Sequence, residues 1–115
     1  MIRVFIGFDT VETVSYHVLS HSIQARCSEP VSITPLMLTQ LSGLMTREHH
    51  NLQSTEFSFS RFLVPHLCDY QGWALFMDCD MLVLDDMADL WNLRDDNFAV
   101  QVVKHDHVPK ETTKF

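Results

Sequence analysis

Residues 73–85 read WALFMDCDMLVLD, and this stretch decides how the rest of the chain is interpreted. The apolar run at 73–77 predicts a buried strand that ends in two carboxylates, Asp78 and Asp80. In an open α/β sheet, ligands bind outside the carboxyl ends of the strands. Two carboxylates at that place repel each other unless a cation or a proton lies between them. Because proteins hold Mg²⁺ with one or two carboxylates together with substrate phosphates, the stretch indicates phosphate-ester or nucleotide chemistry.

The composition fits one small domain and excludes several classes of protein. Of the 115 residues, 46% are apolar, which supports a packed core. The 15 acidic and 8 basic residues give a formal charge of −7, whereas a non-specific nucleic-acid binder needs a basic face. We therefore expect no nucleic acid as a partner. No apolar stretch approaches the roughly 18 residues of a membrane span, so we expect no membrane span either. Three cysteines without metal-binding spacing, and no secretory leader, predict a cytoplasmic setting.

Alternating strand and helix patterns predict an α/β fold. The expected strands are residues 2–8, 31–36, 73–77 and 98–103, and the expected helices are residues 11–26, 54–68 and 87–93. The buried face of the first helix is expected to carry Val11, Val14, Val18, Leu19, Ile23 and Ala25. A short extended piece is expected at 82–84, with Asp85 or Asp86 capping the helix that follows. This order favours a mainly parallel sheet with right-handed crossovers.

Residues outside the D-x-D stretch add candidates for the same sheet edge. Asp9 ends the first strand, where it either faces the crevice of Asp78 or caps the next helix in a loose capping box with Glu12. Gly7 would let a ligand approach the backbone closely. Arg61 carries a lone positive charge in the expected helix at 54–68, which Pro65 would kink or interrupt.

Each candidate also has a plainer interpretation. Arg61 suits a strand-end carboxylate or a phosphate through its forked guanidinium group, but it could equally be a solvated arginine. Asp78 and Asp80 could be turn residues that cap backbone amides.

Residues 58–93, SFSRFLVPHLCDYQGWALFMDCDMLVLDDMADLWNL, resemble the central signature of nucleotide-sugar glycosyltransferases with the GT-A fold, and of the family-eight group in particular. The residues that fall in register with this signature are Arg61, Pro65, Asp78, Asp80, Leu82, Val83, Asp86, Leu90 and Trp91. The first strand, with Gly7, Phe8 and Asp9, is similar to the nucleotide-binding first strand of such enzymes. The resemblance covers residues 1–103.

The resemblance implies a Rossmann-like, mainly parallel sheet with flanking helices, the GT-A type nucleotide-binding half. Residues 1–115 would form a single nucleotide-sugar-binding domain, the N-terminal part of a longer enzyme. That enzyme would be a glycosyltransferase with a nucleotide-diphosphate sugar donor and a Mn²⁺ or Mg²⁺ ion. Its acceptor would be a molecule such as a glycan or a lipopolysaccharide precursor.

The resemblance also implies roles for individual residues. Asp78 would contact the ribose or share the metal, Asp80 would coordinate the metal, and Arg61 would brace the diphosphate. The base and ribose pocket would be lined by Gly7, Phe8 and Asp9. Members of the group usually have a third metal ligand, often a histidine far downstream. No residue of this sequence clearly corresponds to it, although His105 or His107 could take its place.

Two alternatives remain open from the residues. In a haloacid-dehalogenase-like phosphohydrolase, Asp78 would be the nucleophile and Asp80 the acid/base, although Met81 and Leu82 fit that motif badly. In a non-catalytic fragment, the same residues would bind a nucleotide sugar without transferring it.

Overall fold

The computed structural model describes residues 1–44, 56–106 and 108, and its centre is a three-stranded parallel sheet. The strands, in the order β2-β1-β3, are β1 (Ile2–Gly7), β2 (Val31–Leu36) and β3 (Leu75–Met77). Because β1 pairs with a strand on each side, its apolar residues are buried, as the sequence predicted. The expected α/β class with a parallel sheet is confirmed.

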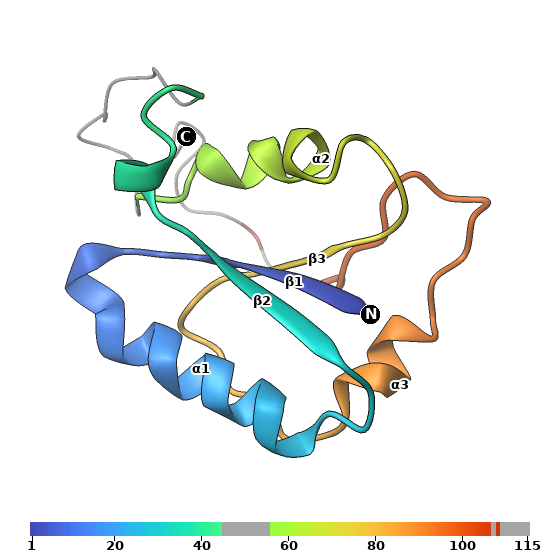
Figure 1. The fold of residues 1–115 in the computed structure, drawn as a ribbon. Helices are drawn as coiled ribbons and strands as arrows, with labels where there is room; N and C mark the ends of the chain where they lie inside the picture. Colours follow the sequence, from blue (N-terminus) through green and yellow to red (C-terminus); the bar gives the residue numbers. More distant parts are fainter. Residues whose placement is uncertain (45–55, 107, 109–115) are drawn as a thin grey trace.

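Helices cover both faces of this sheet (Figure 1). The α-helices are α1 (Thr13–Arg26), α2 (Val64–Leu67) and α3 (Met87–Trp91), and the 3₁₀ helices are η1 (Thr10–Glu12), η2 (Leu38–Gln40) and η3 (Ser60–Leu63). α1 and α3 lie on one face and α2 lies on the other. Side chains alternate along β1, so that Val4 and Ile6 pack with Leu19 of α1, whereas Phe5 packs toward Leu67 of α2.

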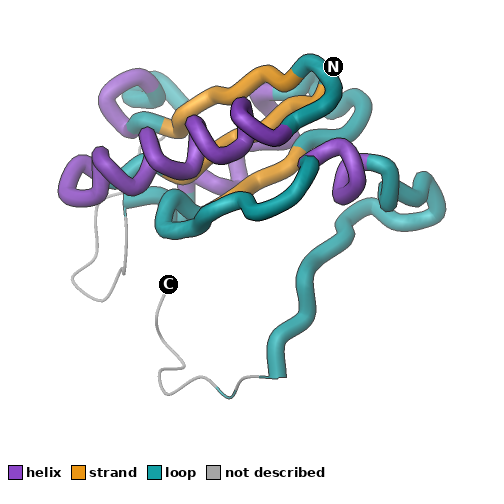
Figure 2. Tube along the Cα trace, turned by 90° about the horizontal axis from the view of Figure 1, so that it is seen from below, coloured by secondary structure: helices purple, strands orange, loops and turns teal. Residues whose placement is uncertain are grey.

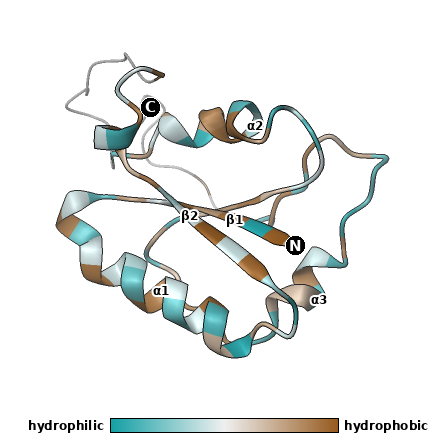
Figure 3. Cartoon of the chain, in the orientation of Figure 1, coloured by the Kyte–Doolittle hydropathy of each residue, from teal (hydrophilic) through white to brown (hydrophobic). Residues whose placement is uncertain are grey.

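Only part of the expected apolar face of α1 is buried. Leu19 and Ile23 are fully buried against the sheet, but Val14 and Val18 are 75% and 49% exposed. Val11 lies in η1, before the α-helix, and is 86% exposed. The helix meets the sheet through the row that contains Leu19 and Ile23. At about 100° per residue, Val18 and Val14 lie roughly 100–180° around the helix from these two residues, so they point away from the sheet. Figure 3 accordingly shows hydrophobic and hydrophilic residues mixed along α1.

The expected helix at 54–68 is wrong in its extent. Residues 54 and 55 lie outside the described part of the chain, residues 56–59 form turns, and η3 and α2 follow. Pro65 stands in the first turn of α2 and therefore begins this helix instead of kinking it. A proline is tolerated there because the first N–H groups of a helix have no intrahelical partner.

Residues 82–84, where an extended piece is expected, form no strand, and their backbone bonds to a side chain instead of a neighbouring strand. The amide of Val83 donates to Oγ of Ser22 in α1 at 3.0 Å, and the Val83 side chain is buried. Asp86 then caps α3 by accepting from the Ala88 amide at 2.9 Å, so the predicted cap is confirmed for Asp86.

The fourth strand expected at 98–103 is wrong. These residues carry no strand assignment, and Phe98, Val100, Val102 and Val103 are 57–76% exposed. An extended segment becomes a strand only when a neighbour supplies hydrogen-bond partners, and none of the described strands lies beside it. Figure 2 shows the chain leaving the body of the domain after α3.

Candidate functional site

The D-x-D pair lies at the carboxyl edge of the sheet, next to the end of the central strand. Ile6 of β1 is opposite Met77 of β3, so the two chains leave the sheet side by side. Asp78 follows directly and its side chain is 47% exposed. Asp80 is exposed as well, whereas Cys79 between them is fully buried. Both carboxylates therefore lie on the solvent side of this edge, on either side of a buried residue in a chain that bends at Cys79 and Asp80.

Arg61 is held beside this pair by two aromatic rings. Its guanidinium carbon lies 5.5 Å from the ring centre of Phe57 and 5.1 Å from that of Phe76. Its Nε donates to the carbonyl of Phe57 at 3.3 Å, and its Nη2 lies 3.5 Å from Oδ1 of Asp78. An ion pair this exposed contributes little to stability, so the rings and the carbonyl fix the arginine. The edge thus carries a positive group in a set position.

The space above Gly7 is filled by the protein itself. A Cβ at Gly7 would lie 2.4 Å from ring atoms of Phe57, which is 3% exposed. The glycine therefore allows an aromatic ring to approach the backbone of β1 closely. The expected close approach of a ligand to Gly7, and any contact of this residue with a nucleotide, stay predictions.

Asp9 is a buried cap, and only 6% of it is exposed. Its Oδ1 accepts from the Val11 amide at 3.1 Å, and its Oδ2 accepts from the Glu56 amide at 3.3 Å. The capping interpretation is confirmed, and a contact with the ribose or base stays a prediction. Phe8 is also buried, with its ring packed edge-on against Tyr16 at 5.6 Å, so its nucleotide contact likewise stays a prediction.

Glu12 does not complete the expected capping box but binds the D-x-D turn. Its Oε2 accepts a hydrogen bond from Sγ of Cys79 at 3.1 Å. Burial, followed by the hydrogen bond and the charge of Glu12, raises the pKa of the Cys79 thiol to about 12. The thiol therefore stays protonated and remains a donor throughout the physiological pH range.

Other contacts at this edge are not visible in the sequence. Glu56 accepts from both the amide and the hydroxyl of Thr10, and so ties the segment before η3 to the end of β1. Ser60 has a buried hydroxyl with no hydrogen-bond partner in the described structure. The sequence around Ser60, FSFSRF at 57–62, does not predict this burial, because its apolar residues follow neither the helical nor the strand period clearly.

The donor atoms at this edge fit a divalent ion that shares its ligands with a phosphate. Within residues 1–44, 56–106 and 108, no group of three or more His, Cys, Asp or Glu residues is placed to hold a metal. The oxygens of Asp78 and Asp80 are nevertheless the hard ligands that Mg²⁺ and Mn²⁺ prefer, and Mg²⁺ commonly uses one or two carboxylates. His105 lies in the exposed segment after α3, and His107 lies outside the described residues.

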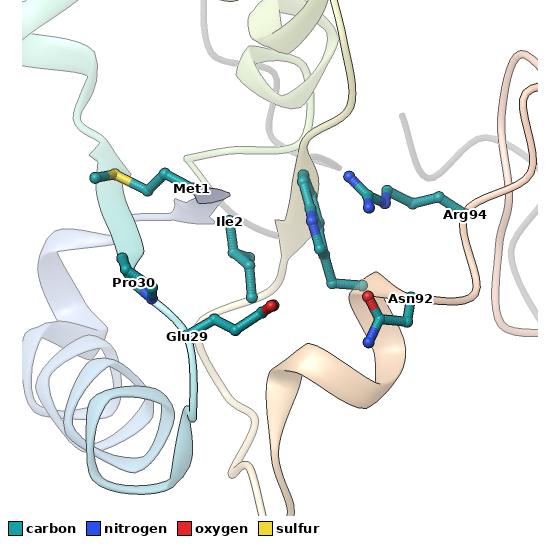
Figure 4. A pocket seen from close by; sticks show the side chains of 7 residues that line it. Met1, Ile2, Glu29, Pro30, Asn92 and Arg94 are labelled. Atoms are coloured by element: carbon teal, nitrogen blue, oxygen red, sulfur yellow. The ribbon is translucent and has the colours of Figure 1, made fainter.

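A cavity of 170 Å³ lies at the opposite, amino end of β1 (Figure 4). It is lined by Met1, Ile2, Glu29, Pro30, Trp91, Asn92 and Arg94. None of these residues belongs to the predicted site. Ligands of open α/β sheets bind at the carboxyl ends of the strands, so we place the functional site at the D-x-D edge.

Comparison with known families shows which family this chain belongs to. The family model described as glycosyl transferase family 8 matches residues 17–115, which include Arg61, Asp78 and Asp80. The chain belongs to this family. The resemblance seen in the sequence is therefore confirmed.

A curated relative of this family 8 chain is Protein CDI of Arabidopsis thaliana. The two are 55% identical over 114 residues, which cover 97% of this chain and 44% of the relative. The family 8 chain thus spans less than half the length of that relative. No solved structure gave a significant match. None of the described helices has the length and apolar character needed to cross a membrane.

Proposed function

We propose that this chain forms the donor site of a metal-dependent glycosyltransferase that uses a nucleotide-diphosphate sugar. The observation that carries the proposal is the pair of outward-facing carboxylates, Asp78 and Asp80, beside a fixed arginine at the sheet edge of a family 8 chain. Asp78 and Asp80 would hold Mn²⁺ or Mg²⁺ together with oxygens of the diphosphate.

The residues at this edge suit the departure of a nucleoside diphosphate. Breaking the bond between the sugar and the diphosphate leaves negative charge on the diphosphate. A divalent ion bound there would neutralise that charge, a Lewis-acid role that contributes several kcal/mol. Arg61 would donate through its forked guanidinium group to the same phosphate oxygens. Because the rings of Phe57 and Phe76 already fix this group, little reorganisation is needed during the reaction.

The first test is the substitution Asp80→Ala, with Asp89→Ala on the surface of α3 as the matched control. Calorimetry with UDP and with GDP, each with and without Mn²⁺, measures the metal-dependent part of the binding. We expect Asp80→Ala to abolish this part and to leave the unfolding temperature nearly unchanged, since Asp80 is exposed. Asp89→Ala should bind like the wild type. Unchanged metal-dependent affinity in Asp80→Ala would overturn the metal assignment.

The second test separates diphosphate binding from nucleoside binding. Arg61→Ala should weaken binding of UDP more than binding of uridine, because only UDP carries the phosphates that the guanidinium group would contact. Arg94→Ala is the matched control, since Arg94 also lies over an aromatic ring, that of Trp91, at 4.1 Å, away from the D-x-D edge. Equal losses for the two ligands would make Arg61 a purely structural residue.

Transfer itself is measured with a nucleotide-sugar donor. Metal-dependent hydrolysis or transfer indicates an enzyme, and metal-dependent binding without turnover indicates the non-catalytic alternative. A covalent aspartyl-phosphate formed at Asp78 from a phosphodonor would indicate the phosphohydrolase alternative instead.

A further inference from the structure

Cys79, the middle residue of the D-x-D stretch, is the buried part of that stretch. It is 0% exposed and packs in the same core cluster as Ile6, Leu19 and Val83. The chain bends at Cys79 and Asp80, directly after β3, so the buried thiol anchors this bend in the core while the carboxylates on either side of it reach solvent. The core thereby fixes the direction of two carboxylates that are themselves exposed.

The thiol also joins the two turns that frame the carboxyl edge. Sγ of Cys79 donates to Oε2 of Glu12 at 3.1 Å. Glu12 is the last residue of η1, the short helix that Asp9 caps at the end of β1. One hydrogen bond therefore connects the turn after β3 with the turn after β1, across 67 positions of the sequence.

This contact also controls where a third carboxylate lies. Glu12 is only partly exposed, and a carboxylate in such a place is costly unless it accepts hydrogen bonds. While Glu12 accepts from Cys79, its negative charge is directed to the thiol. Without this donor, the Glu12 carboxylate would be free to change its position at the edge that carries Asp78 and Asp80, and its negative charge would act against theirs.

We propose that Cys79 is a positioning residue of the donor site, whose buried thiol, bonded to Glu12, sets the geometry of the Asp78 and Asp80 carboxylates before the metal and the diphosphate bind. This inference rests on the function proposed above. Cys79 itself touches neither the ion nor the substrate. Its contribution is to keep two exposed side chains in a binding geometry that they would otherwise lose entropy to reach.

The test is a double-mutant cycle on this contact, measured as UDP affinity with and without Mn²⁺. Cys79→Ala and Glu12→Ala each remove one partner, and the double variant removes both. We expect each single change to weaken Mn²⁺-dependent binding by about tenfold, as for loss of one hydrogen bond to a charged group. The double variant should lose no more than either single variant, because both remove the same contact. UDP affinity without Mn²⁺ should change by less than about twofold, since the thiol acts only through the metal-binding carboxylates.

Two further variants keep the test clear of folding effects. Cys79→Ser restores a small donor and should recover Mn²⁺-dependent affinity to within about threefold of the wild type. Cys68→Ala is the matched control, because this partly buried cysteine packs in the other core cluster, on the face of α2. Its metal-dependent binding should equal that of the wild type.

The outcomes separate the two proposals. If the wild type binds UDP or GDP with Mn²⁺ and Cys79→Ala binds equally well, the positioning role is overturned and the donor site stands. Losses that simply add in the double variant, or that appear equally without Mn²⁺, would overturn it as well. If the wild type shows no metal-dependent binding of either nucleotide, the donor site is wrong and the positioning role falls with it.

Discussion

β3 and residues 98–103 are both apolar, yet only β3 is a strand. β3 has three residues, LFM, and pairs with the buried central strand β1. Residues 98–103, FAVQVV, are twice as many and richer in β-branched side chains, but they lie exposed and unpaired among the described residues. Strand propensity measures how well side chains fit a pleated, half-buried surface, so it has little effect where no such surface is present.

The contacts around the two regions differ in the same way. At the carboxyl edge, Asp78 contacts Arg61 and Cys79 bonds to Glu12, so both of these residues are tied to another segment of the chain. In the segment after α3, the side chain of Gln101 donates to the Leu93 carbonyl and accepts from the Asp95 amide, both fewer than ten positions away. Asp96, earlier in the same segment, accepts from Nε1 of Trp73 at 2.7 Å, but within the described part of the chain the hydrogen bonds of residues 98–103 are all local. Long-range contacts therefore fix the site edge, whereas local ones hold residues 98–103.

The largest effect on the free energy of unfolding is expected at Gly7, where the backbone of the site edge lies against the ring of Phe57. In Gly7→Ala the new methyl group would overlap the ring of Phe57 at 2.4 Å. Overpacking of this kind typically lowers the free energy of unfolding by about 1–3 kcal/mol. Because Phe57 supports Arg61, diphosphate binding should weaken as well. Chemical denaturation and UDP titration measure the two effects.

The control for Gly7→Ala is Gly43→Ala, where a Cβ meets no atom within 4 Å. That variant should be as stable as the wild type, or slightly more stable, since alanine restricts the unfolded chain. If both variants had the same stability, the ring of Phe57 would be free to move away, and the site edge would be no more firmly packed than the rest of the surface.

This difference also explains how much of the molecule could be predicted from sequence. β1, β2, the cap at Asp86 and the D-x-D edge follow from local signals: apolar runs, capping residues and the place where a strand ends. These signals depend on residues near in sequence, which a single chain shows directly.

The rest depends on contacts between distant residues. The pattern of valines in α1 could not tell which row of the helix meets the sheet, and FAVQVV could not tell whether a neighbouring strand exists. Likewise, the partner of Glu12 is a cysteine 67 positions away, and a nearby capping box was the better local explanation. Only the packing of the fold brings such residues together.

A smaller effect is expected at Asp86, which anchors two segments with one carboxylate. Its Oδ1 accepts from the Ala88 amide at 2.9 Å and from the Ser28 amide at 3.1 Å. Asp86→Ala should lower the free energy of unfolding, though by less than Gly7→Ala, because it removes the cap of α3. The neighbouring Asp85→Ala is the matched control, since Asp85 does not cap α3, and its effect should be smaller.

The contribution of Asp86 should also depend on pH. Hydrogen bonds from Ser28, and then from the Ala88 amide, lower the pKa of the Asp86 carboxyl below its ordinary value of 3.8. A group with a lowered pKa in the folded state stabilises the fold above its unfolded pKa, and this contribution is lost as the pH falls. Wild type and Asp86→Ala should therefore differ most at neutral pH and converge below pH 3.8. A difference that persisted in acid would mean that the carboxylate charge is not involved.

The smallest effect is expected at Val102, in the exposed segment. Val102→Thr replaces a methyl group with a hydroxyl of similar size on a side chain that is 76% exposed, so the free energy of unfolding should change by less than about 0.5 kcal/mol. The same substitution at Val83, which is 8% exposed, buries a hydroxyl in the core and should cost about 1–3 kcal/mol. Chemical denaturation of the two variants measures the contrast directly. Equal losses would mean that residues 98–103 pack on the sheet as firmly as Val83 does, which would remove the difference between the anchored edge and the unpaired segment.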